Sequence, residues 1–179
     1  SEFILDESSL FLNNQYQGRD NLQEVERLNM GITSLLLTEE FGNINIFIGQ
    51  SQKLSGTQKN ISISNIDRQS HIINTIDWGL NKNLNFSWFS LYNHHDFKSD
   101  ISDFSINVTN NGWDFSANHR SLNKDFVSNN TDREEFTLEV SKSFANWKTK
   151  YLRKLDLKNN NDKLILETFG LEYTETGYM

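Results

Sequence analysis

The sequence predicts an all-β protein built from antiparallel, up-and-down hairpins, and more specifically a partial transmembrane β-barrel. Three observations predict this fold. Apolar and polar residues alternate with a period of two, turn residues separate the alternating segments, and the connections alternate between short and long. The 179 residues have room for about nine to ten strands of a larger barrel, at roughly 10 residues a strand.

The composition favours a fold that needs few apolar residues. Only 36% of the residues are hydrophobic and the mean hydropathy is -0.63, yet 12% are aromatic. A transmembrane barrel accommodates this composition because each strand needs apolar side chains on one face only. No segment approaches the roughly 18 apolar residues of a membrane-spanning helix. The chain has no cysteine, which excludes disulfides and thiol chemistry within it, and a net charge of -7 argues against a nucleic-acid partner.

Each strand is predicted from three apolar residues at alternate positions, which form one face of that strand. In chain order the triplets are Leu28, Met30 and Ile32; Ile44, Ile46 and Ile48; Ile76, Trp78 and Leu80; Leu84, Phe86 and Trp88; Phe104, Ile106 and Val108; Trp113, Phe115 and Ala117; Phe136, Leu138 and Val140; and Phe169, Leu171 and Tyr173. The residues between them are mostly polar or small, as the opposite face requires. Phe47, Phe89 and Leu91 are exceptions to this alternation.

Two turns set registers that keep like faces together. A type I′ turn at Asn111-Gly112 is favoured because both residues tolerate a positive φ. The cross-strand pairs that it predicts are Asn110 with Trp113, Val108 with Phe115, and Ile106 with Ala117. A three-residue loop at 81–83 predicts the pairs Leu80 with Leu84, Trp78 with Phe86, and Ile76 with Trp88. Both registers keep the apolar residues of neighbouring strands on one face.

The connections are sorted by length, as in outer-membrane barrels, which have short periplasmic turns and longer extracellular loops. The short connections are 38–42, 81–83, 110–112 and 145–146, the longer ones are 55–70, 94–99 and 121–132, and 158–162 is intermediate. Trp113, Phe144 and Trp147 lie beside short turns and Tyr92 lies beside a long loop. These aromatic residues are expected to form the girdles at the two membrane interfaces.

The first third of the chain carries a motif. Residues 8–31 read SSLFLNNQYQGRDNLQEVERLNMG, and residues 46–54 read IFIGQSQKL. This order resembles the barrel of the LptD family of lipopolysaccharide (LPS) assembly proteins. In that family a Leu-Phe pair, Gly-x-Asp and Arg-x-Asn-x-Gly precede a strand that ends in Phe-x-Gly-Gln-Ser. The positions that match this motif are Gly18, Asp20, Arg27, Asn29, Gly31, Gly49 and Gln50. Each of them is either a functional position of the family or a residue that a turn or the start of a strand requires. Where the family often has Ser-Asp at the next strand start, this chain has Ser70 and His71.

The resemblance implies a function without catalysis and without a cofactor. Members of the family form a large barrel around a plug lipoprotein, LptE. They receive LPS from periplasmic LPS-bridge proteins and deliver it to the outer leaflet. For this chain the resemblance implies the outer membrane of a Gram-negative bacterium as the location, and LPS, LptE, the bridge proteins and outer-membrane lipids as partners.

The resemblance also implies that residues 1–179 are a single segment of the barrel domain. The N-terminal jellyroll domain and the cysteines of the family are absent from this chain, and we expect the remaining strands to lie outside it. The end of the chain agrees with this expectation. It stops at Gly177-Tyr178-Met179, whereas a complete barrel usually ends on an aromatic-terminated strand.

Charged residues on two adjacent strands are candidates for a functional role. Glu135 and Glu139 face the same way as Lys148, Lys150 and Lys154 on the next strand, so either register brings opposite charges across from or diagonal to each other. Ion pairs on a solvated face explain this pattern. The functional alternative is that Lys148 and Lys150 are lumen cations that attract LPS phosphates.

Other polar clusters predict no site. His94-His95-Asp96 lies in a loop and has no third or fourth metal ligand at a recognisable spacing. No nucleophile elbow surrounds any serine. His119 or His95, paired with a nearby acidic residue, is the one catalytic pair that the sequence leaves open. The alternative is that each histidine is a polar residue of the lumen or of a loop, without a catalytic role.

Two other folds remain alternatives for this sequence, and each predicts a different function. A small eight-stranded porin-like or adhesin-like outer-membrane barrel would be self-contained and would need a closing strand. A soluble β-sandwich binding module would carry its function on the loops.

Overall fold

The structure is a computed structural model, and it describes residues 25–56, 71–93, 97–124, 131–158 and 163–174. These residues contain nine strands. In chain order they are β1 (Val25–Thr38), β2 (Gly42–Gly56), β3 (His71–Asn81), β4 (Leu84–Asn93), β5 (Ser99–Asn110), β6 (Trp113–Leu122), β7 (Arg133–Phe144), β8 (Trp147–Asp156) and β9 (Lys163–Tyr173). Over the same ranges, no helix is long and apolar enough to cross a membrane.

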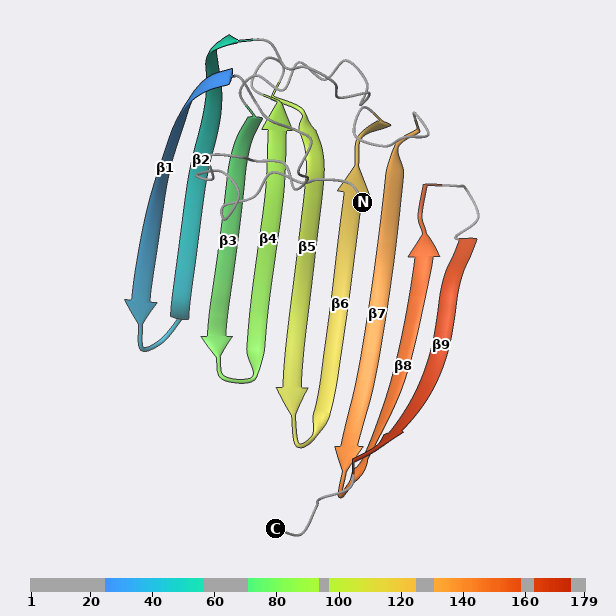
Figure 1. Cartoon of the computed structure of the whole chain (residues 1–179). Coiled ribbons are helices and arrows are strands. Elements are labelled where there is room, and N and C mark those ends of the chain that lie inside the picture. The colour runs from blue at the N-terminus through green and yellow to red at the C-terminus, as the bar shows by residue number, and fades with distance from the viewer. Residues whose placement is uncertain (1–24, 57–70, 94–96, 125–130, 159–162, 175–179) are drawn as a thin grey trace.

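The strands form one open antiparallel sheet in chain order, with β1 and β9 at its edges. Figure 1 shows the short turns at one end of the sheet, and the strand ends that the longer connections join lie at the other end. All eight apolar triplets lie within the strands predicted for them, and the lysine-bearing segment is β8. The up-and-down, all-β prediction is therefore confirmed. Neither a sandwich nor a closed eight-stranded barrel describes this part of the chain, because its nine strands belong to a single unclosed sheet.

The β5–β6 hairpin has the register that its turn residues predict. Asn111 and Gly112 have φ values of 49° and 74°, as a type I′ turn requires. The three predicted pairs across the hairpin are all present. Glycine is needed here for a second reason, because a Cβ on Gly112 would lie 2.9 Å from the carbonyl oxygen of Ser143.

The β3–β4 hairpin differs from the prediction at its tip. Trp78 pairs with Phe86 as expected, but Leu84 lies opposite Asn81 and not opposite Leu80. The register shifts between Gly79 and Asn81, so Leu80 is the extra residue of a bulge. The side chain of Asn81 explains the change, because its Oδ1 accepts a hydrogen bond of 2.8 Å from the backbone N–H of Asn83. This bond tightens the predicted three-residue loop into a two-residue turn.

The registers give the sheet one polar and one apolar face. One side of the sheet carries a continuous row of hydrophilic residues from β2 to β8, and we call this side the polar face. That row consists of Asn45, Asp77, Ser87, Ser105, Asn118, Thr137 and Lys154. On the other side, the apolar face, the neighbouring row consists of Ile44, Trp78, Phe86, Ile106, Ala117 and Leu138. Many large side chains of the apolar face are exposed, with Ile32 at 76% and Phe169 at 73%. A face this apolar and this exposed is typical of contact with lipid.

Aromatic residues gather on the apolar face beside the short turns. Trp113, Phe144 and Trp147 are each at least 40% exposed. The Trp147 ring lies 4.8 Å from the ring of Tyr173, and Lys142 Nζ lies 5.0 Å from the centre of the Trp113 ring. The position of these side chains agrees with an interfacial girdle at this end of the sheet.

The buried core lies on the polar face, at the end of the long connections. It consists of Phe47, Ile73, Leu91, Ile101 and Leu122, all at most 4% exposed, with Phe89 packed against them. The exceptions in the alternation, Phe47, Phe89 and Leu91, therefore belong to one cluster. Sequence patterns did not predict that the other three residues join it.

Candidate functional site

The charged residues of β7 and β8 form ion pairs on the polar face. Lys150 Nζ lies 2.7 Å from Glu139 Oε1, and Lys154 Nζ lies 2.7 Å from Glu135 Oε2. Both pairs are diagonal across the hairpin, because Glu139 lies directly opposite Leu152 and Glu135 opposite Asp156. Diagonal charge pairing, one of the two predicted arrangements, is therefore confirmed.

Glu135 is the most buried of these charges, with 8% of its side chain exposed. Arg133 Nε approaches it to 2.9 Å as a second cation, in ion-pair contact and without the alignment of a hydrogen bond. Two cations therefore compensate one buried carboxylate, as burial of a charge requires.

Lys148 differs from its neighbours on β8. It is exposed and lies opposite Ser143 on β7 and Glu172 on β9. Within the described ranges no carboxylate lies in ion-pair contact with it. Of the two predicted lumen cations, Lys150 is thus neutralised by Glu139, and Lys148 makes no such ion pair, although Glu172 lies opposite it on β9.

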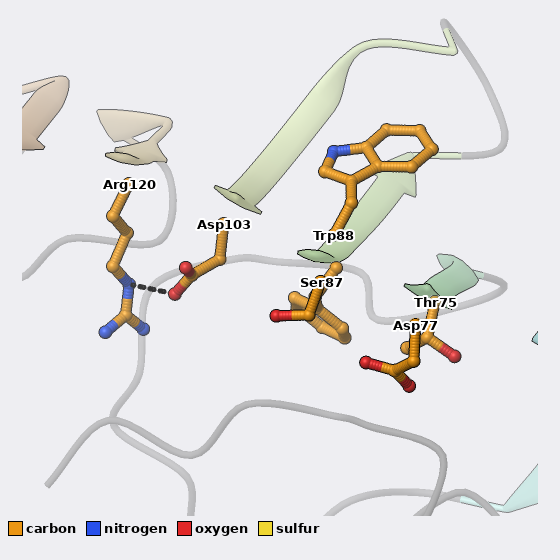
Figure 2. Close-up of a pocket in the computed structure, with 7 residues that line it drawn as sticks. Thr75, Asp77, Ser87, Trp88, Asp103 and Arg120 are labelled. Carbon is orange, nitrogen blue, oxygen red and sulfur yellow. Dashed lines mark ion pairs between the residues drawn. The ribbon is translucent and has the colours of Figure 1, made fainter. Parts of the chain in front are cut away.

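A hollow of about 330 Å³ lies on the polar face between β3 and β6. Its lining residues are Thr75, Asp77, Ser87, Trp88, Phe89, Asp103 and Arg120. Figure 2 shows Arg120 facing Asp103 on one side, Thr75 and Asp77 on the other, and Ser87 between them. The ring of Trp88 points away from these groups, on the opposite side of its strand.

Asp103 organises one side of this hollow. Its Oδ2 lies 3.7 Å from Arg120 Nε, and its Oδ1 accepts a hydrogen bond from the side-chain amide of Asn118. Ser87 Oγ and Ser105 Oγ lie 2.6 Å apart in the neighbouring row. Sequence reasoning missed this site, although counting back from the Asn111-Gly112 turn places Asp103 directly opposite Arg120, where the structure has it.

A second hollow, of about 310 Å³, lies nearer the short turns. It is lined by Asn107, Thr109, Asp114, Phe115, Ser116 and Glu139. The carboxylate of Asp114 accepts hydrogen bonds of 3.1 Å from the hydroxyls of Thr109 and Ser141. This carboxylate is therefore held by its neighbours and is not open to a ligand on those two sides.

The motif positions come together across β1 and β2. Gly31 lies directly opposite Gly49, Asn29 opposite Ser51, and Met30 opposite Gln50. The backbone of Arg27 pairs with Lys53. Gly18 and Asp20 lie outside the described residues. The structure thus makes neighbours of two motif halves that are about twenty residues apart, and a functional role for them stays a prediction.

Of the histidines that the sequence singled out as candidates, the structure describes His119. His94, His95 and Asp96 lie outside the described residues. His119 Nε2 lies 2.9 Å from Glu134 Oε1, and His119 belongs to strand β6 and not to a loop. The pair lies on the apolar face, the side of Ala117. Within the described ranges, no group of three or more His, Cys, Asp or Glu side chains could hold a metal ion.

A buried pair that the sequence did not predict joins β3 to β5. His71 Nε2 and Asp100 Oδ2 lie 3.1 Å apart, each side chain being 6% exposed. Asp100 can reach over β4 because the β4–β5 register shifts there, placing Leu91 opposite Ile101 but Tyr92 opposite Ser99. Asn123 Nδ2 donates a further hydrogen bond to Asp100. The contacts hold three strands together at the end of the long connections.

Comparison with known protein families gives one match. The model of LptD, described as LPS transport system D, matches residues 1–153. The matched region contains β1 to β7 and most of β8. No curated protein matches the chain.

Proposed function

Because this chain belongs to the LptD family, LPS transport system D, we propose that its sheet is part of the wall of an outer-membrane β-barrel whose lumen delivers LPS to the outer leaflet. Membership in the family gives the chain a role in LPS transport, and the family is one of transport proteins and not of known enzymes. The location that we propose is the outer membrane of a Gram-negative bacterium. The proposed partners are LptE, which would plug the barrel, and the periplasmic bridge proteins.

The observation that carries this proposal is the contrast between the two faces of one sheet. On the polar face hydrophilic side chains run without interruption from β2 to β8 in the row of Asp77 and Asn118. On the apolar face large side chains such as Ile32 and Phe169 are exposed. A barrel wall needs this arrangement, because one side meets hydrocarbon and the other lines a hydrated lumen.

The sheet also supports the proposal that residues 1–179 are one barrel segment. The family match ends at residue 153, yet β9 pairs with β8 from Trp147 to Asp156 in the same antiparallel sense as the other strands. The pairing continues along all of β8 with one register shift, between Lys154 and Leu155, and this continuity supports placing β9 in the same wall.

Lys148 is the residue on which we place a role in transport. An exposed cation that makes no ion-pair contact can attract phosphate groups in an aqueous channel. We propose that it contacts LPS phosphates, and that Lys150 contributes less because Glu139 lies 2.7 Å away. Unaltered transport after replacement of both lysines with Ala would remove this role.

Attaching a bulky group to one face of the sheet at a time tests whether LPS passes along the polar face. The chain has no cysteine, so a single cysteine at Asn107 or Ile106 is unique within it. Reaction of Asn107→Cys with a large maleimide should stop LPS delivery, because this position faces the proposed lumen. The adjacent Ile106→Cys, on the apolar face, is the matched control and should keep its transport rate. Equal transport by both labelled proteins would contradict the lumen route.

A further inference from the structure

The hollow between β3 and β6 contains polar atoms that lack partners. Thr75 Oγ1 and Arg120 Nε are buried and make no hydrogen bond. Asp77 is exposed, and it has neither a hydrogen bond nor an ion pair with any residue that the structure describes. Buried polar atoms in proteins are nearly always hydrogen-bonded. The hollow therefore offers a ligand one buried donor and one buried hydroxyl that lack partners, and the exposed carboxylate of Asp77 lies beside them.

The charge of the hollow selects the kind of ligand. Asp77 and Asp103 contribute two carboxylates, and Arg120 contributes one guanidinium. Arg120 and Asn118 already engage Asp103, whereas the exposed carboxylate of Asp77 is in contact with water and has no partner among the described residues. An ionised carboxylate only accepts hydrogen bonds. A phosphate, which is also an anion with acceptor oxygens, would be repelled at this position.

A hydroxyl group meets both requirements of the hollow. It can donate to Asp77 and accept from Arg120 Nε, and Thr75 and Ser87 can act as donor or acceptor. The half-buried ring of Phe89 lies between them, opposite Thr75 on one side and Asp103 on the other. An aromatic surface with a few converging polar groups is the usual composition of a small-molecule site.

We propose that this hollow is a binding subsite for neutral sugar residues, which it holds through their hydroxyl groups. The proposal rests on the proposed function, because it assigns the sugar part of LPS to β3–β6 and leaves the phosphates to Lys148 on β8. Two to five strand spacings of about 4.8 Å, roughly 10 to 24 Å, separate the two places across the sheet. The row of Asp77 and Ser87 reaches β8 at Lys154, so the distance from Lys154 to Lys148 adds roughly 20 Å along the strand. One glycolipid can span that distance.

Binding of simple probes to the full-length protein in detergent micelles tests the subsite. The probes are maltotriose, a neutral sugar, and inorganic phosphate, and saturation-transfer NMR gives the dissociation constants. Asp77→Ala should weaken maltotriose binding roughly tenfold, because it removes a charged hydrogen-bond acceptor. Asp114→Ala, the same substitution on the same face outside the hollow, should leave it unchanged. Asp77→Lys should lose maltotriose and gain phosphate.

Three results would overturn the subsite: no maltotriose binding, equal binding by Asp77→Ala and the unaltered protein, or tighter binding of phosphate than of sugar by the unaltered protein. Photoreactive residues separate this failure from failure of the proposed function. Thr137 and Ser87 lie in the same row of the polar face. LPS adducts with a photoreactive residue at position 137 but not at position 87 would contradict the sugar subsite and still support the LPS route through the lumen. Adducts at neither position would reject the lumen route itself.

Discussion

Lys150 Nζ lies 2.7 Å from Glu139 Oε1, so one of the two lysines at the short-turn end of β8 is neutralised within the sheet. The other, Lys148, lies two residues away on the same face and has no carboxylate partner in the described part of the chain. Alternation along one strand has thus produced two lysines with different electrostatic surroundings. The difference decides which of them can attract an anion.

Removal of the charge of Lys148 should slow LPS release. We expect Lys148→Gln to reduce the rate in reconstituted vesicles about two- to fivefold, because an exposed charge pair contributes at most about 1 kcal/mol. The effect should shrink as salt is added. The control replaces Lys150 and Glu139 together with Gln, which leaves the net charge unchanged. A larger loss in this double variant than in Lys148→Gln would contradict the account.

A lysine on the apolar face should destabilise the inserted protein. Ile106 lies between Phe86 and Ala117 on that face, and Asn107 is the next residue on the polar face. Ile106→Lys should cost about 2–4 kcal/mol, the penalty for a lysine near the middle of the bilayer, whereas Asn107→Lys should be tolerated. Urea unfolding of the protein in lipid vesicles measures both. A larger loss for Asn107→Lys would reverse our assignment of the faces.

The β5–β6 turn should depend on its glycine. Gly112 has a φ of 74°, and a Cβ there would lie 2.9 Å from the carbonyl oxygen of Ser143. We expect Gly112→Ala to lower the free energy of unfolding by about 1–2 kcal/mol, the cost of a left-handed L-residue. Ala145, in the β7–β8 turn, has a φ of 49°, so Ala145→Gly should be neutral or stabilising. Unfolding curves of the two variants should therefore shift differently, and an unshifted Gly112→Ala curve would contradict the turn geometry.

Much of the fold follows from the sequence because period-two alternation and turn chemistry are local. The pair Val108 and Phe115 is fixed by the two residues of its turn, and the same register places Asp103 opposite Arg120. The Leu80–Leu84 pair failed because one side-chain hydrogen bond, from Asn83 N–H to Asn81 Oδ1, creates a bulge. The bulge and the three-residue loop differ by a small free energy, and a hydrophobic pattern does not predict which of the two forms.

Contacts that skip a strand were not predictable in this way. His71 meets Asp100 only because of a bulge in β5, and the two residues are 29 positions apart in the chain. The apolar face also carries charges that the triplets did not indicate, such as Arg153 directly opposite Glu167. Both residues are exposed. The polar hollow was missed for a different reason, since its residues come from four strands and carry no motif.

The pKa of Asp132, in the connection between β6 and β7, should lie below its ordinary value of 3.8. The backbone N–H of Lys124 donates to its carboxylate at 2.9 Å, and Lys158 Nζ lies 3.1 Å away, so both favour the charged form. A lowered pKa means that this contribution to stability is present above pH 3.8 and is lost as the pH falls through the lowered pKa.

Titration of the Asp132 carboxyl carbon by NMR measures this shift. Salt and Lys158→Ala should each raise the pKa toward 3.8, although the hydrogen bond from Lys124 remains. Asp132→Asn should remove the associated pH dependence. A pKa at or above 3.8 at low salt would show that the two loops are not joined by these contacts.

Photo-crosslinking along β6 tests the central claim, that the polar face lines the route of LPS. The full-length protein carries a photoreactive residue at Phe115, Ser116, Ala117 or Asn118, in phospholipid vesicles with LPS supplied from the side of the short turns. We predict LPS adducts at Ser116 and Asn118, on the polar face, and phospholipid adducts at Phe115 and Ala117. LPS adducts confined to Phe115 and Ala117, or equal at all four positions, would contradict a route through the lumen.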